Sequence, residues 1–222
     1  MRALRPLVSF LTVAALVFTL GQGDAFAKKE KKEKTPTSEL VSIEMCGVAE
    51  ADTKVFEPAK QLHDTLNEIE TNLTSGNAAF VSALGITEGT PFADALASLK
   101  TTAGDKLTVA MDGAMPKVSV QDGVPDNVKA AVDSLNVFID AHVKAIDLAK
   151  DLPTQAQALV AAAQSLDPAA LAQQAAANPM EIPKVLKTIN NNLSAIKTTP
   201  DRVTNVTGTL TTNVDAIKGL GS

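Results

Sequence analysis

Apolar residues recur at intervals of three and four positions along most of the chain beyond residue 57. The first such run begins at Ala59 and continues through Leu62, Leu66 and Ile69, and the same spacing returns several times before the C-terminus. At this spacing the apolar side chains share one face of an α-helix. The pattern therefore predicts a series of amphipathic helices.

Prolines mark the expected helix starts. Each stands just before an apolar run, often beside Asp, Thr or Glu, as the first turn of a helix favours. Thr199-Pro200 is one of the clearest, because it joins a capping side chain to a ring whose missing N–H costs nothing there. The six prolines in question are Pro58, Pro91, Pro125, Pro168, Pro183 and Pro200.

The connections between the expected helices are short, and short connections place helices as antiparallel neighbours. Residues 46–222 are therefore expected to form an all-α fold, an elongated up-and-down bundle of five or six amphipathic helices. The size of this segment is enough for one domain with a substantial core.

One segment fits two patterns. With a period of two, the apolar residues of "KLTVAMDGAMPKVSVQDGVP", 106–125, would face each other across a tight turn as a β-hairpin. With steps of three and four, Leu107, Ala110 and Ala114 continue the helix that begins near Pro91. The helix is favoured because a lone two-stranded hairpin is marginal in water. An irregular connection would follow it, and the hairpin is the alternative.

The N-terminus has the layout of a secretory signal peptide. Arg2 and Arg5 precede an apolar run, Leu7–Leu20, and a small-x-small site follows at Ala25-Phe26-Ala27. The apolar run is short for a membrane-spanning helix. Residues 1–27 are thus expected to be removed on export, and an uncleaved anchor is the alternative.

Charge divides the rest of the chain. Residues 28–45 are expected to be a charged, disordered leader, whose run Lys28–Lys34 has five Lys against two Glu. From Leu40 onward there are 13 Lys/Arg against 21 Asp/Glu. An acidic body repels phosphate backbones, so nucleic acid is not an expected partner. The Lys-rich leader is compatible with weak contact to an anionic surface.

Residues suited to catalysis or metal binding are few. His63 and His142 lie on or beside the apolar stripes of two long helices, near the middle of each, so they could approach each other and share a metal. The Glu three residues earlier that di-metal bundle sites use is absent, since Lys60 and Ile139 stand there. Imidazoles hydrogen-bonded to their neighbours are the commoner outcome, so no metal or cofactor is expected.

Cys46 is the single cysteine, so no intramolecular disulfide can form. We expect its thiol to be buried as a small hydrophobic group, with an intermolecular disulfide as the alternative. The chain also has no glycine-rich phosphate loop, no HExxH and no GxSxG motif. These observations predict no catalytic residue and no enzymatic activity.

The predicted function is therefore that of an exported protein, periplasmic or secreted, which acts as an interaction or structural component of the cell envelope. A protein partner would bind to helix faces. The alternatives are a carrier that holds a lipid or other apolar ligand between its helices, and a peripheral binder of a membrane surface.

Overall fold

A computed structural model describes residues 42–112 and 115–221 of the 222-residue chain. The predicted all-α bundle of five or six helices is confirmed, with a small two-stranded sheet beside it. In chain order the elements are α1 (Ala49–Ala51), the π-helical turn η1 (Asp52–Phe56), α2 (Glu57–Leu84), α3 (Phe92–Ala103), the 3₁₀ turn η2 (Gly104–Lys106), β1 (Leu107–Asp112), β2 (Met115–Val120), α4 (Asp126–Ala149), α5 (Leu152–Gln164), α6 (Pro168–Ala175), α7 (Ile182–Lys218) and the 3₁₀ turn η3 (Gly219–Gly221).

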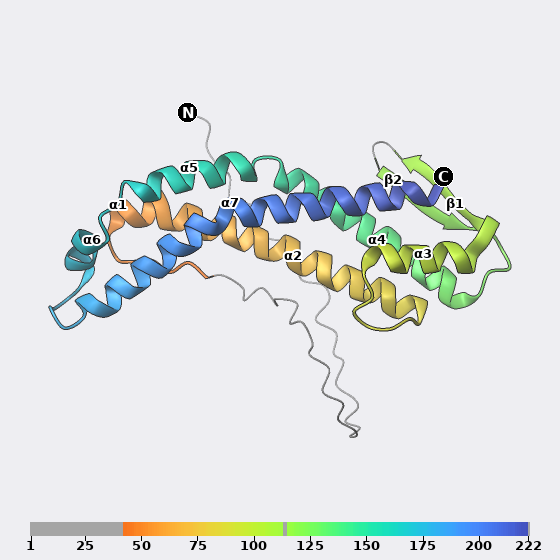
Figure 1. Ribbon diagram of the computed structural model, residues 1–222, viewed down its shortest axis with the longest axis horizontal. Coiled ribbons are helices and arrows are strands. Elements are labelled where there is room, and N and C mark those ends of the chain that lie inside the picture. Colours follow the sequence, from red (N-terminus) through yellow and green to blue (C-terminus); the bar gives the residue numbers. More distant parts are fainter. Residues whose placement is uncertain (1–41, 113–114, 222) are drawn as a thin grey trace, which may run out of the picture. The chain divides into compact units, whose positions relative to one another are not determined.

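The bundle has three long columns (Figure 1). One is α2, the second is α4 followed by α5, and the third is α7. The column α4–α5 runs in the opposite direction to α2 and α7, as expected for an up-and-down bundle. Helix α3 and the hairpin pack near one end of these columns, and α1 and α6 near the other. None of the helices in the described ranges combines the length and apolar character needed to cross a bilayer.

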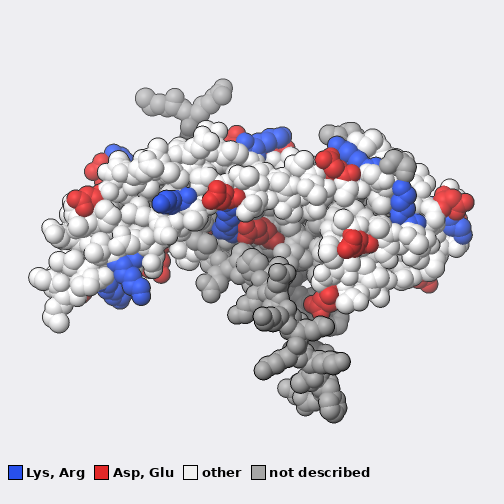
Figure 2. Space-filling model, viewed as in Figure 1, with Lys and Arg blue, Asp and Glu red and all other residues white. Residues whose placement is uncertain are grey.

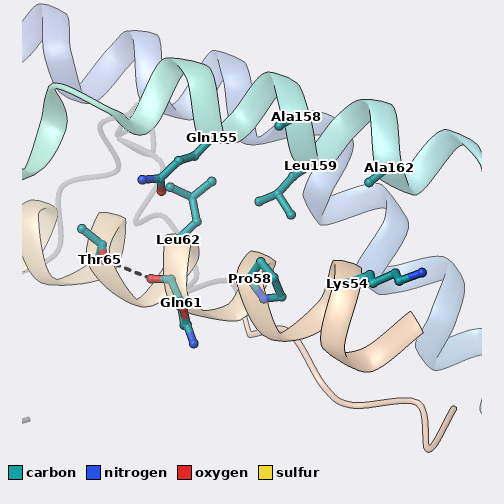
Figure 3. A pocket seen from close by; sticks show the side chains of 9 residues that line it. All are labelled: Lys54, Pro58, Gln61, Leu62, Thr65, Gln155, Ala158, Leu159 and Ala162. Carbon is teal, nitrogen blue, oxygen red and sulfur yellow. Dashed lines mark hydrogen bonds between the residues drawn. The ribbon is translucent and has the colours of Figure 1, made fainter. Parts of the chain in front are cut away.

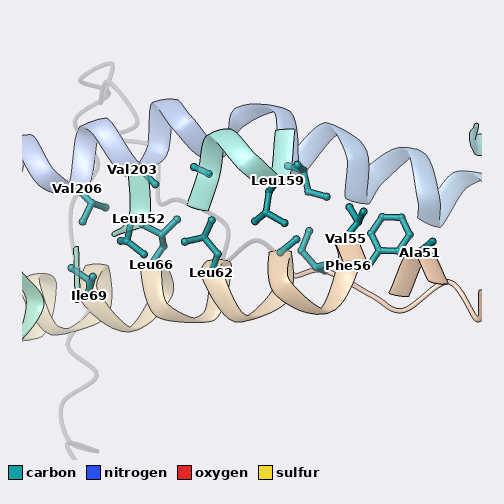
Figure 4. Packing of buried hydrophobic residues seen from close by; sticks show 14 of the residues in the cluster. Ala51, Val55, Phe56, Leu62, Leu66, Ile69, Leu152, Leu159, Val203 and Val206 are labelled. Atoms are coloured by element: carbon teal, nitrogen blue, oxygen red, sulfur yellow. The ribbon is translucent and has the colours of Figure 1, made fainter. Parts of the chain in front are cut away.

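Two separate hydrophobic cores lie along the columns. The first, here called the Phe56 core, joins α2 to the end of α4, to α5 and α6, and to α7 as far as Leu210, and Figure 4 shows part of it. Its members include Phe56, Leu62, Leu66, Ile69, Leu152, Leu159, Ile189, Ile196, Val203 and Leu210. The second, the Phe138 core, joins the end of α2 to α3, β2, α4 and the end of α7; its members include Phe80, Phe92, Leu99, Leu135, Phe138, Ile139 and Ile217. Helix α7 thus contributes to both.

The favoured helix over residues 106–115 is wrong, because β1 begins at Leu107, directly after the 3₁₀ turn η2, and pairs with β2 as a hairpin. Helix α3 ends at Ala103, where Gly104 has φ 58°, a left-handed backbone that glycine adopts without strain. In the hairpin Val109 lies opposite Val118. Val118 is buried in the Phe138 core, and the Asn136 side chain of α4 bonds to both its N–H and its C=O. Packing on α4 therefore stabilises a hairpin that would be marginal alone.

The helix start predicted at Pro200 is also wrong, since Pro200 lies inside α7. Its ring removes the usual hydrogen bond to the carbonyl of Ile196. The helix continues because Ile196, Thr199 and Val203 are all buried on the same face. Prolines are a common cause of helix kinks, and α7 changes direction part-way along its length in Figure 1. The starts predicted at Pro91, Pro125, Pro168 and Pro183 agree with the structure.

The helix predicted to start at Pro58 begins earlier in the structure. Helical structure starts at Ala49, and Pro58 follows the π-helical turn. The packed body also begins before Cys46, since Ile43 is buried and the backbone of Glu44 pairs with the side chain of Asn192. The signal peptide predicted over 1–27 and the leader as far as residue 41 lie outside the described residues.

Candidate functional site

A groove runs between α5 and the first part of α2, beside the Phe56 core (Figure 3). Its volume is about 580 Å³. The wall contributed by η1 and α2 comprises Lys54, Pro58, Gln61, Leu62 and Thr65, and that contributed by α5 comprises Gln155, Ala158, Leu159 and Ala162.

The alanines of α5 explain why the groove is open. Ala158 and Ala162 face α2 with a single methyl group each, so they fill little of the space between the two helices. Leu62 and Leu159 are buried and form the floor, which closes the Phe56 core beneath. Gln61, Thr65 and Gln155 supply amide and hydroxyl groups. The groove therefore offers apolar contact at its base and hydrogen-bonding groups around it.

The π-helical turn places Lys54 at one end of this groove. Pro58 has no N–H, so the carbonyl of Lys54 cannot receive the ordinary α-helical bond from it. The chain winds wider here, and the N–H of Glu57 bonds to the carbonyl of Asp52, five residues back. The Asp52 carboxylate accepts the backbone N–H groups of Cys46 at 2.7 Å and Gly47 at 2.8 Å, which anchors the start of the turn.

A second groove lies between α5 and α7. Helix α5, which is rich in alanine, therefore has a groove on each side. Its volume is about 340 Å³, and its walls are mainly apolar. Lys197 and Gln164 are its polar members, and Val160, Ala163, Leu166, Leu193 and Ile196 are its apolar ones.

The polar groups of both grooves are amides, a hydroxyl and ammonium groups. Among the described residues that line them, none is His, Cys, Asp or Glu. The one ammonium group of the first groove, Lys54 Nζ, lies 2.7 Å from Glu50 Oε1 in an exposed ion pair.

His63 lies outside these grooves, buried between α2 and α7 with 1 % of its surface exposed. Arg202 Nη1 is 3.2 Å from its Nδ1, and a guanidinium can only donate, so Nδ1 carries no proton. The proton is therefore on Nε2, which donates to Thr199 Oγ1 at 2.8 Å, and Thr199 donates to the carbonyl of Ala195 at 3.0 Å. Burial, and then the Arg202 charge, lower the His63 pKa from 6.5 to about 4.

Arg202 is the centre of this polar cluster. Its Nε and Nη2 donate to the two carboxylate oxygens of Glu70 at 2.8 and 2.6 Å, and Nη2 also donates to Asn67 Oδ1 at 2.6 Å. Paired N–H···O bonds of this kind are among the stronger ion-pair geometries. The cluster fastens α2 to α7 at the edge of the Phe56 core.

His142 is held in the opposite tautomer. Its Nδ1 lies 3.0 Å from the carbonyl of Phe138, which can only accept, so Nδ1 carries the proton. Nε2 then accepts from Asn213 Nδ2 at 3.0 Å. Its ring packs edge-on against Phe138 with centroids 4.2 Å apart. Burial lowers the pKa of His142.

The two histidines are not brought together. Their partners on α7, Thr199 and Asn213, are separated by fourteen residues, roughly 21 Å at 1.5 Å per residue. The arrangement in which they share a metal is therefore not the one observed, and each imidazole has its own protein partners. Within residues 42–112 and 115–221, no group of three or more His, Cys, Asp or Glu is placed to hold a metal ion.

Cys46 is buried, as predicted, and burial raises the pKa of its thiol. It lies beside a third cavity, of about 340 Å³, at the start of α7. The polar members of this cavity are Glu44, Glu181, Lys184 and Thr188. A buried thiol with a raised pKa is poorly suited to nucleophilic chemistry.

Sequence reasoning did not find Arg202, Glu70 and Asn67. Their one sequence signal is that each adjoins the apolar stripe of its helix, a common position for a solvated side chain.

Comparison with known proteins gives no functional assignment, because the chain matches no family model, no curated protein and no solved structure.

Proposed function

We propose that this chain is an exported, non-enzymatic interaction protein of the cell envelope, and that it binds an apolar segment of a partner protein in the α2–α5 groove. The observation that carries the proposal is the composition of the groove, with Leu62 and Leu159 at its base and Gln61, Thr65 and Gln155 around it. Amphipathic helices commonly dock in grooves that combine these two kinds of surface.

The groove suits a polypeptide better than a lipid tail. A lipid carrier needs an apolar chamber that encloses its ligand, whereas this cavity is open along one side and has polar groups on both walls (Figure 3). The side-chain amides of Gln61 and Gln155 can each donate and accept a hydrogen bond, which matches the side chains or exposed backbone of a docked segment. Beneath the groove the Phe56 core is packed.

Charge does not define a binding surface on the face seen in Figure 2. Lys and Arg lie there among Asp and Glu in small groups, and most of the surface is uncharged. This distribution supports recognition through apolar and hydrogen-bonding contact rather than through a field of one sign.

A pair of alanines on α5 allows a direct test of the groove. Ala158 lines it, whereas Ala161 is exposed on the same helix and lines neither groove. A photo-crosslinking amino acid placed at either position in the producing cells should give a specific protein adduct from 158 and none from 161. The same partner should co-purify with A161E and be lost with A158E.

The adduct's chemistry decides between the candidate functions. A protein adduct confined to position 158 supports the proposal. A lipid adduct at 158, together with a lipid mass in native mass spectrometry of the purified protein, would favour the carrier instead. Equal crosslinking from both positions would contradict a site in the groove.

Export is supported by Arg2, Arg5 and the apolar run Leu7–Leu20 ahead of Ala27. If residues 1–27 are a signal peptide, the protein recovered outside the cytoplasm should begin at Lys28 by N-terminal sequencing. Recovery of the intact N-terminus in the membrane fraction would instead indicate an anchor.

A further inference from the structure

The two outer edges of the hairpin differ. On β2, Asn136 Oδ1 accepts the N–H of Val118 at 3.0 Å and Asn136 Nδ2 donates to its C=O at 2.8 Å. Pro116, on the same strand, has no N–H to offer to another strand. The β2 edge is therefore covered by α4 and closed to further pairing.

Among the described residues, the outward backbone groups of the β1 edge are unpaired, while the side chain of Val109 packs against Gly221 of η3 on one face of the strand. The N–H of Gln121 donates to the carbonyl of Lys106 at 3.0 Å, and this bond shows which residues of β1 direct their backbone groups toward β2. Because successive residues of an antiparallel strand turn their backbone groups to opposite sides, Thr108 and Ala110 bond to β2, and Val109 and Met111 direct theirs outward. No residue in the described ranges bonds to these outward groups.

The composition of β1 does not protect this edge. Natural edge strands are commonly blunted by Lys, by Pro or by a bulge, but residues 107–111 are uncharged, contain no proline and pair in continuous register with β2. Thr108 and Ala110 are exposed, and Met111 has 58 % of its surface exposed.

We propose that β1 pairs antiparallel with β1 of a second copy of this chain, centred on Val109. In this register the two Val109 residues, one from each copy, exchange both of their N–H···O bonds. The N–H of Met111 in each copy donates to the carbonyl of Leu107 in the other copy. The N–H of Leu107 is not needed, and it already bonds to the carbonyl of Gly104.

The sequence of β1 is complementary to itself in this register. Leu107 of one copy lies opposite Met111 of the other, so an exposed methionine gains an apolar neighbour. Thr108 lies opposite Ala110 at both places where these residues meet, so the exposed face of the joined strands carries small side chains only. A one-step change of register would lose these pairs.

The closed β2 edge explains why the pairing stops at two chains. The joined sheet has the order β2–β1–β1–β2, and both of its outer edges are then covered by Asn136 and Pro116. An interface in which the same surface is used by both copies closes as a two-fold dimer. Because the contact is one short strand pair, we expect dissociation at about 10–100 µM chain.

Charges on the exposed face of β1 test the pairing without entering either core. T108K/A110K sets lysine opposite lysine at both 108–110 pairs and should weaken dimerisation roughly tenfold. T108K/A110E sets lysine opposite glutamate and should keep the wild-type dissociation constant or lower it. S119K/Q121K adds the same charge as the first variant, on β2 and the turn after it, and is the control for charge alone.

The measurement is sedimentation equilibrium of the protein purified from cells that express the full chain, with thermal melts to show that each variant is folded. A dimer that T108K/A110K weakens, and that T108K/A110E and the control retain, supports the proposal. Wild-type protein that is still monomeric at about 1 mM would overturn it and leave the edge to a strand of a different protein. A dimer that T108K/A110K does not weaken would overturn it as well.

Discussion

The Phe56 core and the Phe138 core are built on the same three columns but are packed differently. In the Phe138 core three phenylalanines and His142 contact one another, with the Phe92 and Phe138 rings 4.9 Å apart. In the Phe56 core the facing helix α5 is rich in alanine and leaves a groove on each side. The rings fill the centre of the Phe138 core and leave a groove of about 250 Å³ between α2 and α4, whereas the small side chains of α5 leave two larger grooves beside the Phe56 core.

The largest difference should appear when a ring is removed from each core. Phe56 and Phe138 are both fully buried. We expect Phe138→Ala to cost about 4–5 kcal/mol of unfolding free energy, and Phe56→Ala about 3 kcal/mol, because α5 and its small side chains can move into the space left behind. Urea unfolding measures both. Equal losses would mean that the two cores are equally rigid.

The two buried histidines should make the free energy of unfolding depend on pH. The His63 pKa is about 4 when folded and about 6.5 when unfolded, so as pH falls the unfolded chain takes up the proton first. The contribution of His63 to the free energy of unfolding is therefore fully present above pH 6.5. It is lost as the pH falls from 6.5 to 4, and for this shift the loss is about 3 kcal/mol.

The variant H63Q isolates this effect, since glutamine can still bond to Arg202 and Thr199 but does not titrate. Its unfolding free energy should fall less than that of the wild type between pH 7 and pH 4. The remaining fall includes His142, whose pKa is also lowered. A pH profile identical to the wild type would show that His63 does not carry the dependence.

Glycine in a helix gives the next contrast. A Cβ at Gly76 in α2 would overlap the Phe138 ring, whereas one at Gly208 in α7 would meet nothing within 4 Å. Gly76→Ala should therefore cost about 1–3 kcal/mol by overpacking, although alanine favours helix. Gly208→Ala should stabilise by about 0.5–1 kcal/mol. Thermal unfolding measures both variants. A lower melting temperature for Gly76→Ala and a higher one for Gly208→Ala would distinguish the effect of crowding from that of helix propensity.

The smallest effects should come from the groove. Ala158 and Ala161 are both exposed on α5, so A158E and A161E should each change the unfolding free energy by less than about 0.5 kcal/mol. Chemical denaturation of the two purified variants checks this. A large loss with A158E alone would mean that the groove is closed in solution.

The helices could be predicted from sequence because their signal is local. The spacing that begins at Ala59 and the prolines at 91, 125, 168 and 183 lie within or beside the elements they mark. The hairpin and Pro200 could not be read correctly in the same way, because the groups that decide them are distant. Asn136 stabilises β2 from α4, and Pro200 is retained by buried neighbours on α7.

The candidate site was less accessible to sequence reasoning. Alanines in α5 favour a helix whether their methyl groups are packed or leave a groove, since helix propensity does not depend on the neighbouring column. His63 was identified as a candidate, but Arg202, which determines its tautomer, is 139 residues away in the chain. Only the fold brings them together.

Helix α7 has a consequence for how the chain opens. Its 37 residues contribute to both cores, and they are fastened to α2 through Arg202 and to α4 through Asn213. Neither core can be dismantled without releasing part of the same helix. The slowest backbone amides along α7 should therefore exchange with deuterium at a common rate set by global unfolding, with faster exchange near Ile182 where the helix begins.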